Sequence, residues 1–154
     1  MTLEKQVIER LGEKGYKIST AESCTGGLIA GTLVNVAGAS EVFEEGYITY
    51  ANQAKIKLLG VSEQTLKSFG AVSEQVASQM AAGCAGAAGA EVGIASTGIA
   101  GPDGGSPEKP VGLVYLGCSV KERVVVKRYL LEGDRRQIRE GAVQEALKLI
   151  LESL

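Results

Sequence analysis

The sequence predicts a three-layer α/β/α sandwich built on a mixed, mostly parallel β-sheet. Segments with helical periodicity alternate with short β-branched segments over the first 98 residues, and two strand-like segments around a tight polar turn follow them. Alternating helices and strands are typical of a parallel sheet covered on both faces, and the hairpin makes one strand antiparallel. We therefore expect one domain over residues 1–154.

The first elements are expected to form a strand, turn, helix, strand unit. An opening helix should end at Gly15, and a strand over 16–21 should run into the sequence ESCTGG. Segment 28–38 is predicted to be a helix that begins at the glycine pair, and segment 46–50 a second strand.

Three further helices are expected in the middle of the chain, each beginning at a polar residue that can cap its N-terminus. Asn52, Ser62 and Ser73 are the candidate caps. The last of these helices covers 74–90, and its alanines and glycines permit very close packing against its neighbours.

The second half of the sheet is predicted from 91–98, a third strand, and from 111–120 and 122–132, which form a hairpin. Asp134 should cap a final helix with one apolar face. The residues expected to be buried on that face are Ile138, Ala142, Val143, Ala146, Leu147, Ile150 and Leu151.

Composition favours small-molecule chemistry. The net charge is −2, the pI is near 5.3 and no cluster of Lys or Arg occurs, so no nucleic-acid partner and no membrane surface is expected. The N-terminal segment lacks the continuous apolar stretch of a signal peptide, so no export signal is expected, and no segment reaches the run of about twenty apolar residues that a membrane span needs. Cys24, Cys84 and Cys118 are widely spaced and indicate reduced thiols in a cytoplasmic protein.

The chain contains no histidine. The Ser-His-Asp triad, the Cys-His dyad and the HExxH zinc site all need an imidazole, so these chemistries are excluded and no metal site is expected. A hydrolase of this sequence has to take its base from Lys, Tyr, Asp or Glu.

The sequence ESCTGG places Ser23 at the tip of a strand, before Thr25, Gly26 and Gly27 open a helix. A serine hydroxyl would be exposed there, beside unpaired backbone N–H groups that can hold an oxyanion or a phosphate. A tight turn in which serine and threonine only cap the helix explains the spacing equally well. Cys24 is the rival nucleophile, although a lone cysteine beside small residues is more often a buried apolar side chain.

A second candidate group lies in GYITYANQAK, where Tyr50 ends a strand and Lys55 follows one turn into the next helix. A lysine acts as a base at neutral pH only where burial or a nearby cation lowers its pKa. Taken alone, Lys55 would be a solvated helix residue. Lys57 should face elsewhere on the helix and serves as the comparison residue.

A third candidate region is the segment STGIAGPDGGSPEKPVG, which contains all three prolines of the chain and begins in the last residues of the third strand. Thr97, Gly98 and Gly101 lie where the carboxyl ends of parallel strands form ligand sites. Glycines let a ligand approach the backbone and prolines stiffen the loop, as in a segment that clasps a substrate. An ordinary surface crossover is the alternative.

The order of these motifs resembles that of the CinA C-terminal domain family. The resemblance extends from Tyr16 to the final helix and rests on five segments: ESCTGG, GYITYANQAKIKLLGV, GAVSEQVA, STGIAGPDGG and KPVG. Single-domain members of this family are nicotinamide-nucleotide amidases. The resemblance therefore implies hydrolysis of nicotinamide mononucleotide to nicotinic acid mononucleotide and ammonia, without a cofactor.

The resemblance also assigns roles to residues. It makes Ser23 the nucleophile, Tyr50 and Lys55 the acid/base partners, and Thr97 a residue that orients the substrate. Arg135 and Arg139 lie near the start of the last helix, where either could reach a phosphate, with Arg135 favoured.

The expected partners are a small-molecule nucleotide substrate and, by analogy with the family, further copies of the chain in a dimer or higher homo-oligomer. Longer family members carry an extra N-terminal domain, whose activity is not transferred here. Two alternatives stay open: a nucleotide-binding module without catalysis, and a competence-related interaction module, which the acidic pI opposes.

Overall fold

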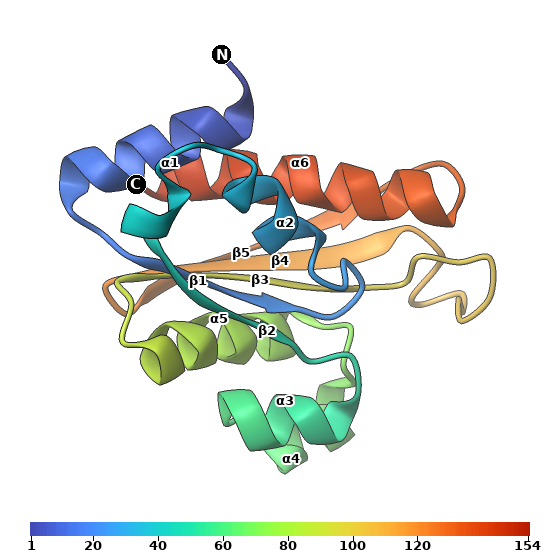
Figure 1. The fold of residues 1–154 in the computed structure, drawn as a ribbon. Helices are drawn as coiled ribbons and strands as arrows, with labels where there is room; N and C mark the ends of the chain where they lie inside the picture. Colours follow the sequence, from blue (N-terminus) through green and yellow to red (C-terminus); the bar gives the residue numbers. More distant parts are fainter.

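The computed structural model describes all 154 residues and places five strands in one sheet between two layers of helices (Figure 1). The strands are β1 (Ile18–Glu22), β2 (Phe43–Ile48), β3 (Val92–Gly98), β4 (Leu113–Val120) and β5 (Arg123–Leu130). Their order across the sheet is β2-β1-β3-β4-β5. Strand β1 pairs in parallel with β2 and β3, whereas β4 is antiparallel to both of its neighbours, so only β4 runs the other way. The predicted fold class is confirmed.

One face of the sheet is covered by α1 (Leu3–Lys14), α2 (Leu28–Val34) and α6 (Arg135–Ser153) (Figure 1). Gly15 ends α1 in the left-handed conformation, as expected. Asp134 caps α6, and Gln137 completes a capping box with it. Of the predicted apolar face of α6, six residues are buried and Leu151 is only half-buried, because it lies in the last turn of the helix.

The other face is covered by α3 (Asn52–Leu59), α4 (Glu63–Phe69) and α5 (Glu74–Ala88). Glycines bring α5 very close to its neighbours: a Cβ added to Gly83 would lie 2.1 Å from the Leu59 carbonyl oxygen, and one added to Gly93 of β3 would lie 2.2 Å from that of Ala81. The close packing expected of α5 is therefore present.

Two predicted boundaries in the first half are wrong. Asn52 does not cap α3; Ala51 is the N-cap, without a side-chain bond, and Asn52 is the first helical residue. Strand β2 also begins three residues earlier and ends two residues earlier than the predicted 46–50, because its register is set by β1, from Ile18 opposite Phe43 to Glu22 opposite Ile48. Local β-propensity alone did not show this.

Other boundaries differ by a few residues. The helix expected over 28–38 ends at Val34, and a short 3-10 helix, η1 (Ala39–Glu41), follows Gly38. Ser62 and Ser73 cap α4 and α5 as predicted. The hairpin is confirmed, with the turn at Lys121 and Glu122, both of which have positive φ.

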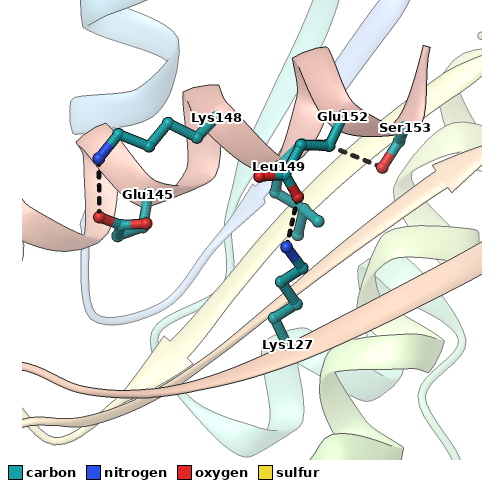
Figure 2. A network of polar contacts seen from close by, with 6 residues as sticks. All are labelled: Lys127, Glu145, Lys148, Leu149, Glu152 and Ser153. Carbon is teal, nitrogen blue, oxygen red and sulfur yellow. Dashed lines mark hydrogen bonds and ion pairs between the residues drawn. The ribbon is translucent and has the colours of Figure 1, made fainter.

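The C-terminal half of α6 contacts the outer strand β5 through an exposed ion pair. Lys127 of β5 forms an ion pair with Glu152, while Lys148 pairs with Glu145 along the helix (Figure 2). The Ser153 hydroxyl also donates to the Leu149 carbonyl at 2.7 Å. These exposed pairs add little stability individually, and the buried face listed above holds the helix on the sheet. No helix is both long enough and apolar enough to span a membrane.

The connections define a switch point between β1 and β3. The chain leaves β1 through α2 on one face to reach β2, and leaves β2 through α3, α4 and α5 on the opposite face to reach β3. Ligands in open α/β sheets bind beyond the carboxyl ends of the strands at such a point. The start of α6 and the loop after β3 lie at this edge as well, on the right in Figure 1.

The glycines of α5 give a test of the close packing. We expect Gly83→Ala to lower the free energy of unfolding by about 1 to 3 kcal/mol, because its methyl group would collide with the Leu59 backbone. Gly86→Ala, three residues later in the same helix, has no atom within 4 Å of the new Cβ and should raise stability by up to about 1 kcal/mol. Urea unfolding of both variants measures this, and equal effects would contradict the packing argument.

Candidate active site

A pocket of about 210 Å³ opens at the switch point between β1 and β3. It is formed by the end of β1, the start of α3, the segment before α5, the loop after β3 and the first residue of α6. Its lining residues are Ser23, Cys24, Tyr50, Asn52, Lys55, Ala71, Val72, Thr97, Gly98, Ala100 and Arg135.

Ser23 is fixed at the tip of the central strand β1. Its N–H donates to the Ser96 carbonyl at 3.0 Å, which extends the pairing with β3. On the other side, the Thr49 N–H donates to the Glu22 carbonyl at 2.9 Å and extends the pairing with β2. The Ser23 side chain lines the pocket with only 9% of the residue exposed, so its position is set by the sheet.

Lys55 is the charged residue that the pocket buries. It is 1% exposed, and its Nζ lies 3.0 Å from the Ser23 Oγ. Nζ also donates to the carbonyl oxygens of Thr49 at 2.7 Å and Tyr50 at 3.2 Å. Burial lowers the pKa of Lys55 from 10.5 to about 8, while the nearby Cys24 sulfur acts in the opposite direction. Lys57, two residues on, is exposed, so the predicted contrast between the two lysines is confirmed.

The three oxygens around Nζ match the three N–H donors of a lysine ammonium. A neutral amine has two N–H donors and one lone pair. Nζ donates to the Ser23 hydroxyl as well as to the Thr49 and Tyr50 carbonyls, and once it loses a proton its lone pair can face the Ser23 hydroxyl. The structure therefore brings a serine hydroxyl and a buried lysine amine into direct contact.

Tyr50 lies at the mouth of the pocket and is 63% exposed. Its hydroxyl accepts a hydrogen bond from Arg135 Nη2 at 3.2 Å, and only its backbone carbonyl contacts Lys55. The structure thus places Tyr50 in the same pocket as Ser23, with its hydroxyl turned to the arginine.

The turn after Ser23 is braced by a buried carboxylate that the sequence analysis did not single out. Glu22 accepts from the Thr25 hydroxyl at 2.6 Å and from the N–H groups of Ile29 at 2.8 Å and Ala30 at 3.0 Å. Thr25 also bonds to Ser96, at 2.7 Å between the hydroxyls. The start of α2 is therefore occupied by the chain's own anion. An acidic residue at the end of a fully buried strand was the available signal.

Gly26 and Gly27 allow this turn, because both have positive φ, 57° and 105°. The backbone N–H groups of Cys24, Thr25 and Gly27 donate to no oxygen of the chain. They are the donors that remain available beside Ser23.

Cys24 lines the pocket but is not suited to act as the nucleophile. Burial raises the pKa of its thiol to about 11, so the thiol stays protonated at neutral pH. Among the two adjacent candidates, the geometry favours Ser23.

Thr97 and Gly98 line the pocket at the end of β3, as the sequence suggested. The Thr97 hydroxyl donates to the Ala71 carbonyl at 2.8 Å and is buried. Thr97 therefore fixes the segment before α5 against the pocket, and a contact between Thr97 and the substrate stays a prediction.

The two candidate arginines of α6 differ in position. Arg135 lines the pocket, and its Nη1 donates to the Gly101 carbonyl at 2.8 Å. Arg139 does not line the pocket and donates instead to the carbonyls of Cys24 and Thr25. Of the two, only Arg135 lines the pocket, and its contact with a substrate phosphate stays a prediction.

Four lining residues escaped the sequence reasoning. Asn52, taken as a helix cap, is at the pocket with no side-chain hydrogen bond, and Ala71, Val72 and Ala100 supply apolar wall. Small apolar residues carry no chemical signal in a sequence, so only their place in the fold reveals them. No three His, Cys, Asp or Glu side chains are grouped so as to hold a metal ion.

The buried amine should make stability depend on pH. Between pH 8 and 10.5 the unfolded chain binds a proton at Lys55 that the folded chain has lost, so the free energy of unfolding rises with pH across this window, by about 3 kcal/mol from this residue. Lys55→Met lacks this rise, whereas the exposed Lys57→Met should follow the wild type. Urea unfolding from pH 7 to 10.5 measures the difference, and parallel curves for wild type and Lys55→Met would refute it.

Comparisons with known proteins agree with the fold and the motif order. The model of the CinA C-terminal domain matches residues 1–154. A CinA-like protein of Kosmotoga olearia is 55% identical over 153 residues, which cover 99% of this chain and 37% of the relative. The chain thus spans little more than a third of the curated relatives that it matches.

Solved structures match at nearly full length. The competence/damage inducible protein CihA from Agrobacterium tumefaciens has a TM-score of 0.94 and 45% identity, with 97% of this chain and 92% of that chain covered. A CinA superfamily protein from Escherichia coli has a TM-score of 0.95 and 37% identity, with coverages of 99% and 88%. With a family model that covers every residue and structures of the same fold, this chain belongs to the CinA C-terminal domain family.

Proposed function

We propose that the chain hydrolyses the carboxamide of nicotinamide mononucleotide, giving nicotinic acid mononucleotide and ammonia. The observation that carries the proposed chemistry is the 3.0 Å contact between Lys55 Nζ and Ser23 Oγ inside the pocket. The choice of substrate comes from the resemblance to single-domain members of the family. A step of this kind belongs to the recycling of pyridine nucleotides.

In the first half of the reaction, neutral Lys55 takes the proton of the Ser23 hydroxyl as Oγ attacks the carboxamide carbon. The carbonyl π electrons move to oxygen and form a tetrahedral oxyanion. The unpaired N–H groups of Cys24 and Thr25 are the proposed donors to it. Lys55 then returns the proton to the amide nitrogen, the C–N bond breaks, and ammonia leaves an acyl ester on Ser23.

In the second half, water attacks the ester carbon and gives a proton to Lys55. The second tetrahedral intermediate breaks the bond to Oγ, and Lys55 returns the proton to Ser23. The acid product leaves as a carboxylate with a free proton, so one amide and one water become one carboxylate, one ammonia and one proton. These steps consume only water, and the proposal includes no cofactor.

The pocket suggests an orientation for the nucleotide. Its carboxamide would face Ser23, and its phosphate would lie toward Arg135, the pocket-lining cation that is exposed. The Tyr50 ring at the mouth offers an aromatic face to the positively charged pyridinium ring. Lys55 is the proposed proton acceptor, because the Tyr50 hydroxyl contacts Arg135 and not Ser23.

The proposal is tested by ammonia release from nicotinamide mononucleotide and a small panel of other carboxamides. We expect Ser23→Ala to lose nearly all turnover while staying folded, since it removes only the bond-forming oxygen. Cys24→Ala should stay active, because its thiol is protonated and makes no bond to substrate. The opposite ranking would make this a cysteine amidase. Nucleotide binding without ammonia release, or salt-dependent DNA binding, would favour the two alternative functions instead.

The base is tested separately through pH and charge. Because the pKa of Lys55 is lowered to about 8, kcat/KM should rise with pH and level off above that value, where the amine is neutral. Lys55→Arg keeps the positive charge but supplies no neutral base, so it should be nearly as inactive as Lys55→Ala. Lys57→Ala should be nearly silent. Substantial turnover by Lys55→Arg would show that the lysine acts only through its charge.

A further inference from the structure

We infer that Arg139 is a positioning residue, which orients the oxyanion-binding N–H groups after Ser23 and does not bind the substrate. This inference rests on the proposed function, since it assigns a task within the same reaction. It also replaces the expectation that Arg139 reaches a phosphate.

The contacts of Arg139 are all with the turn that follows the nucleophile. Its Nε donates to the Cys24 carbonyl at 2.9 Å and its Nη2 to the Thr25 carbonyl at 3.2 Å. A Cβ added at Gly26 would lie 3.2 Å from Nη2, so the missing side chain at Gly26 leaves room for the guanidinium. The planar fork of an arginine fits two successive carbonyls, which a lysine cannot bridge in this way.

Holding a carbonyl also fixes the N–H group of the same peptide unit. The peptide unit is planar, and in a trans peptide its N–H points opposite to its C=O. Only the Gly101–Pro102 bond is cis in this chain. The bond from Arg139 to the Cys24 carbonyl therefore sets the direction of the Thr25 N–H. The preceding unit is fixed likewise, since the Ser23 carbonyl accepts from the Gly26 N–H at 3.1 Å, which sets the Cys24 N–H.

Like the Gly27 N–H, these two N–H groups donate to no oxygen of the chain. Buried N–H groups are nearly always paired, so adjacent free ones beside a nucleophile are poised for an external acceptor. A cation bonded to the carbonyl side of a peptide unit polarises the unit and strengthens its N–H as a donor. Arg139 thus supplies orientation and polarisation through the backbone.

Arg135 and Arg139 are one helical turn apart, and we assign substrate binding to the first and positioning of the turn to the second. Arg135 lines the pocket and bonds to Gly101 and Tyr50, so its loss should weaken substrate binding and raise KM. Arg139 contacts only the turn, so its loss should reduce transition-state stabilisation and lower kcat.

Steady-state kinetics on three glutamine variants test this division. We expect Arg139→Gln to lower kcat by about 10²-fold, the effect of losing one oxyanion donor, with KM changed less than about threefold. Arg135→Gln should mainly raise KM, and Arg136→Gln, whose side chain is exposed and pairs with Glu140, should match the wild type. The pH midpoint of Arg139→Gln should equal that of the wild type, because Lys55 is untouched, and Arg139→Lys should recover only part of kcat. A raised KM with unchanged kcat for Arg139→Gln would overturn the inference.

A second readout does not depend on the substrate assignment. When Ser23 displaces fluoride from a fluorophosphonate probe, the phosphoryl oxygen of the probe lies where the oxyanion would lie. The labelling rate therefore measures how well the N–H donors stabilise that oxygen, and no amide substrate is needed. Labelling should slow by about 10²-fold in Arg139→Gln and stay within about twofold in Arg135→Gln. If nicotinamide mononucleotide is not hydrolysed, the proposed function fails while this comparison still tests Arg139. Equal labelling rates in both variants would refute the role given to Arg139.

Discussion

The Lys55 amine is buried at the carboxyl edge of the sheet, and a buried amine is costly unless its surroundings accept its hydrogen atoms. The chain provides those acceptors through its backbone. Strand β2 ends at Ile48, and the segment that follows turns its carbonyls at Thr49 and Tyr50 toward Nζ before α3 begins. The helix then returns the lysine to the tip of β1, so the geometry of the site depends on where β2 stops.

The Glu22 carboxylate is buried in the same region, and hydrogen-bond donors of the chain surround it just as acceptors surround the Lys55 amine. The carboxylate accepts from two N–H groups of α2 and from Thr25, and thereby fills the helix start that many nucleotide-binding α/β folds leave for phosphate. A nucleotide in this pocket has to place its phosphate elsewhere, and Arg135 at the start of α6 is the cation that lines the pocket mouth. For the proposed substrate, the internal anion favours an arrangement in which the amide, and not the phosphate, lies beside β1.

Much of this architecture could be predicted from the sequence, because its signals are local. The helical periodicity and the hairpin turn predicted elements that the structure contains. The structure also confirms the predicted caps at Ser62, Ser73 and Asp134. The predicted boundaries of β2 were wrong because they depend on pairing with β1. The prediction that Asn52 caps α3 was wrong because an asparagine at the start of a helix fits the sequence pattern of a cap whether or not it caps the helix.

The sequence analysis named most of the polar residues that line the pocket but missed the contacts that hold them in place. Ser23, Lys55 and Arg135 do converge on one pocket. Glu22 holds the start of α2, which is only a few residues away in the sequence. Arg139 holds the Cys24 carbonyl from more than a hundred residues away, and no spacing pattern in the sequence predicts such a contact. The homo-oligomeric state, the cytoplasmic location and the absence of a nucleic-acid partner stay predictions.

The three cysteines have a practical consequence. Burial raises the pKa of Cys24 and Cys118 to about 11 and that of Cys84 to about 12, so almost none of the reactive thiolate exists at neutral pH. Alkylating reagents should therefore modify the native protein slowly. A cysteine introduced at an exposed position of the loop after β3, such as Glu108, would be the one thiol that reacts quickly. That selectivity makes the protein suitable for attaching a single fluorophore to this loop.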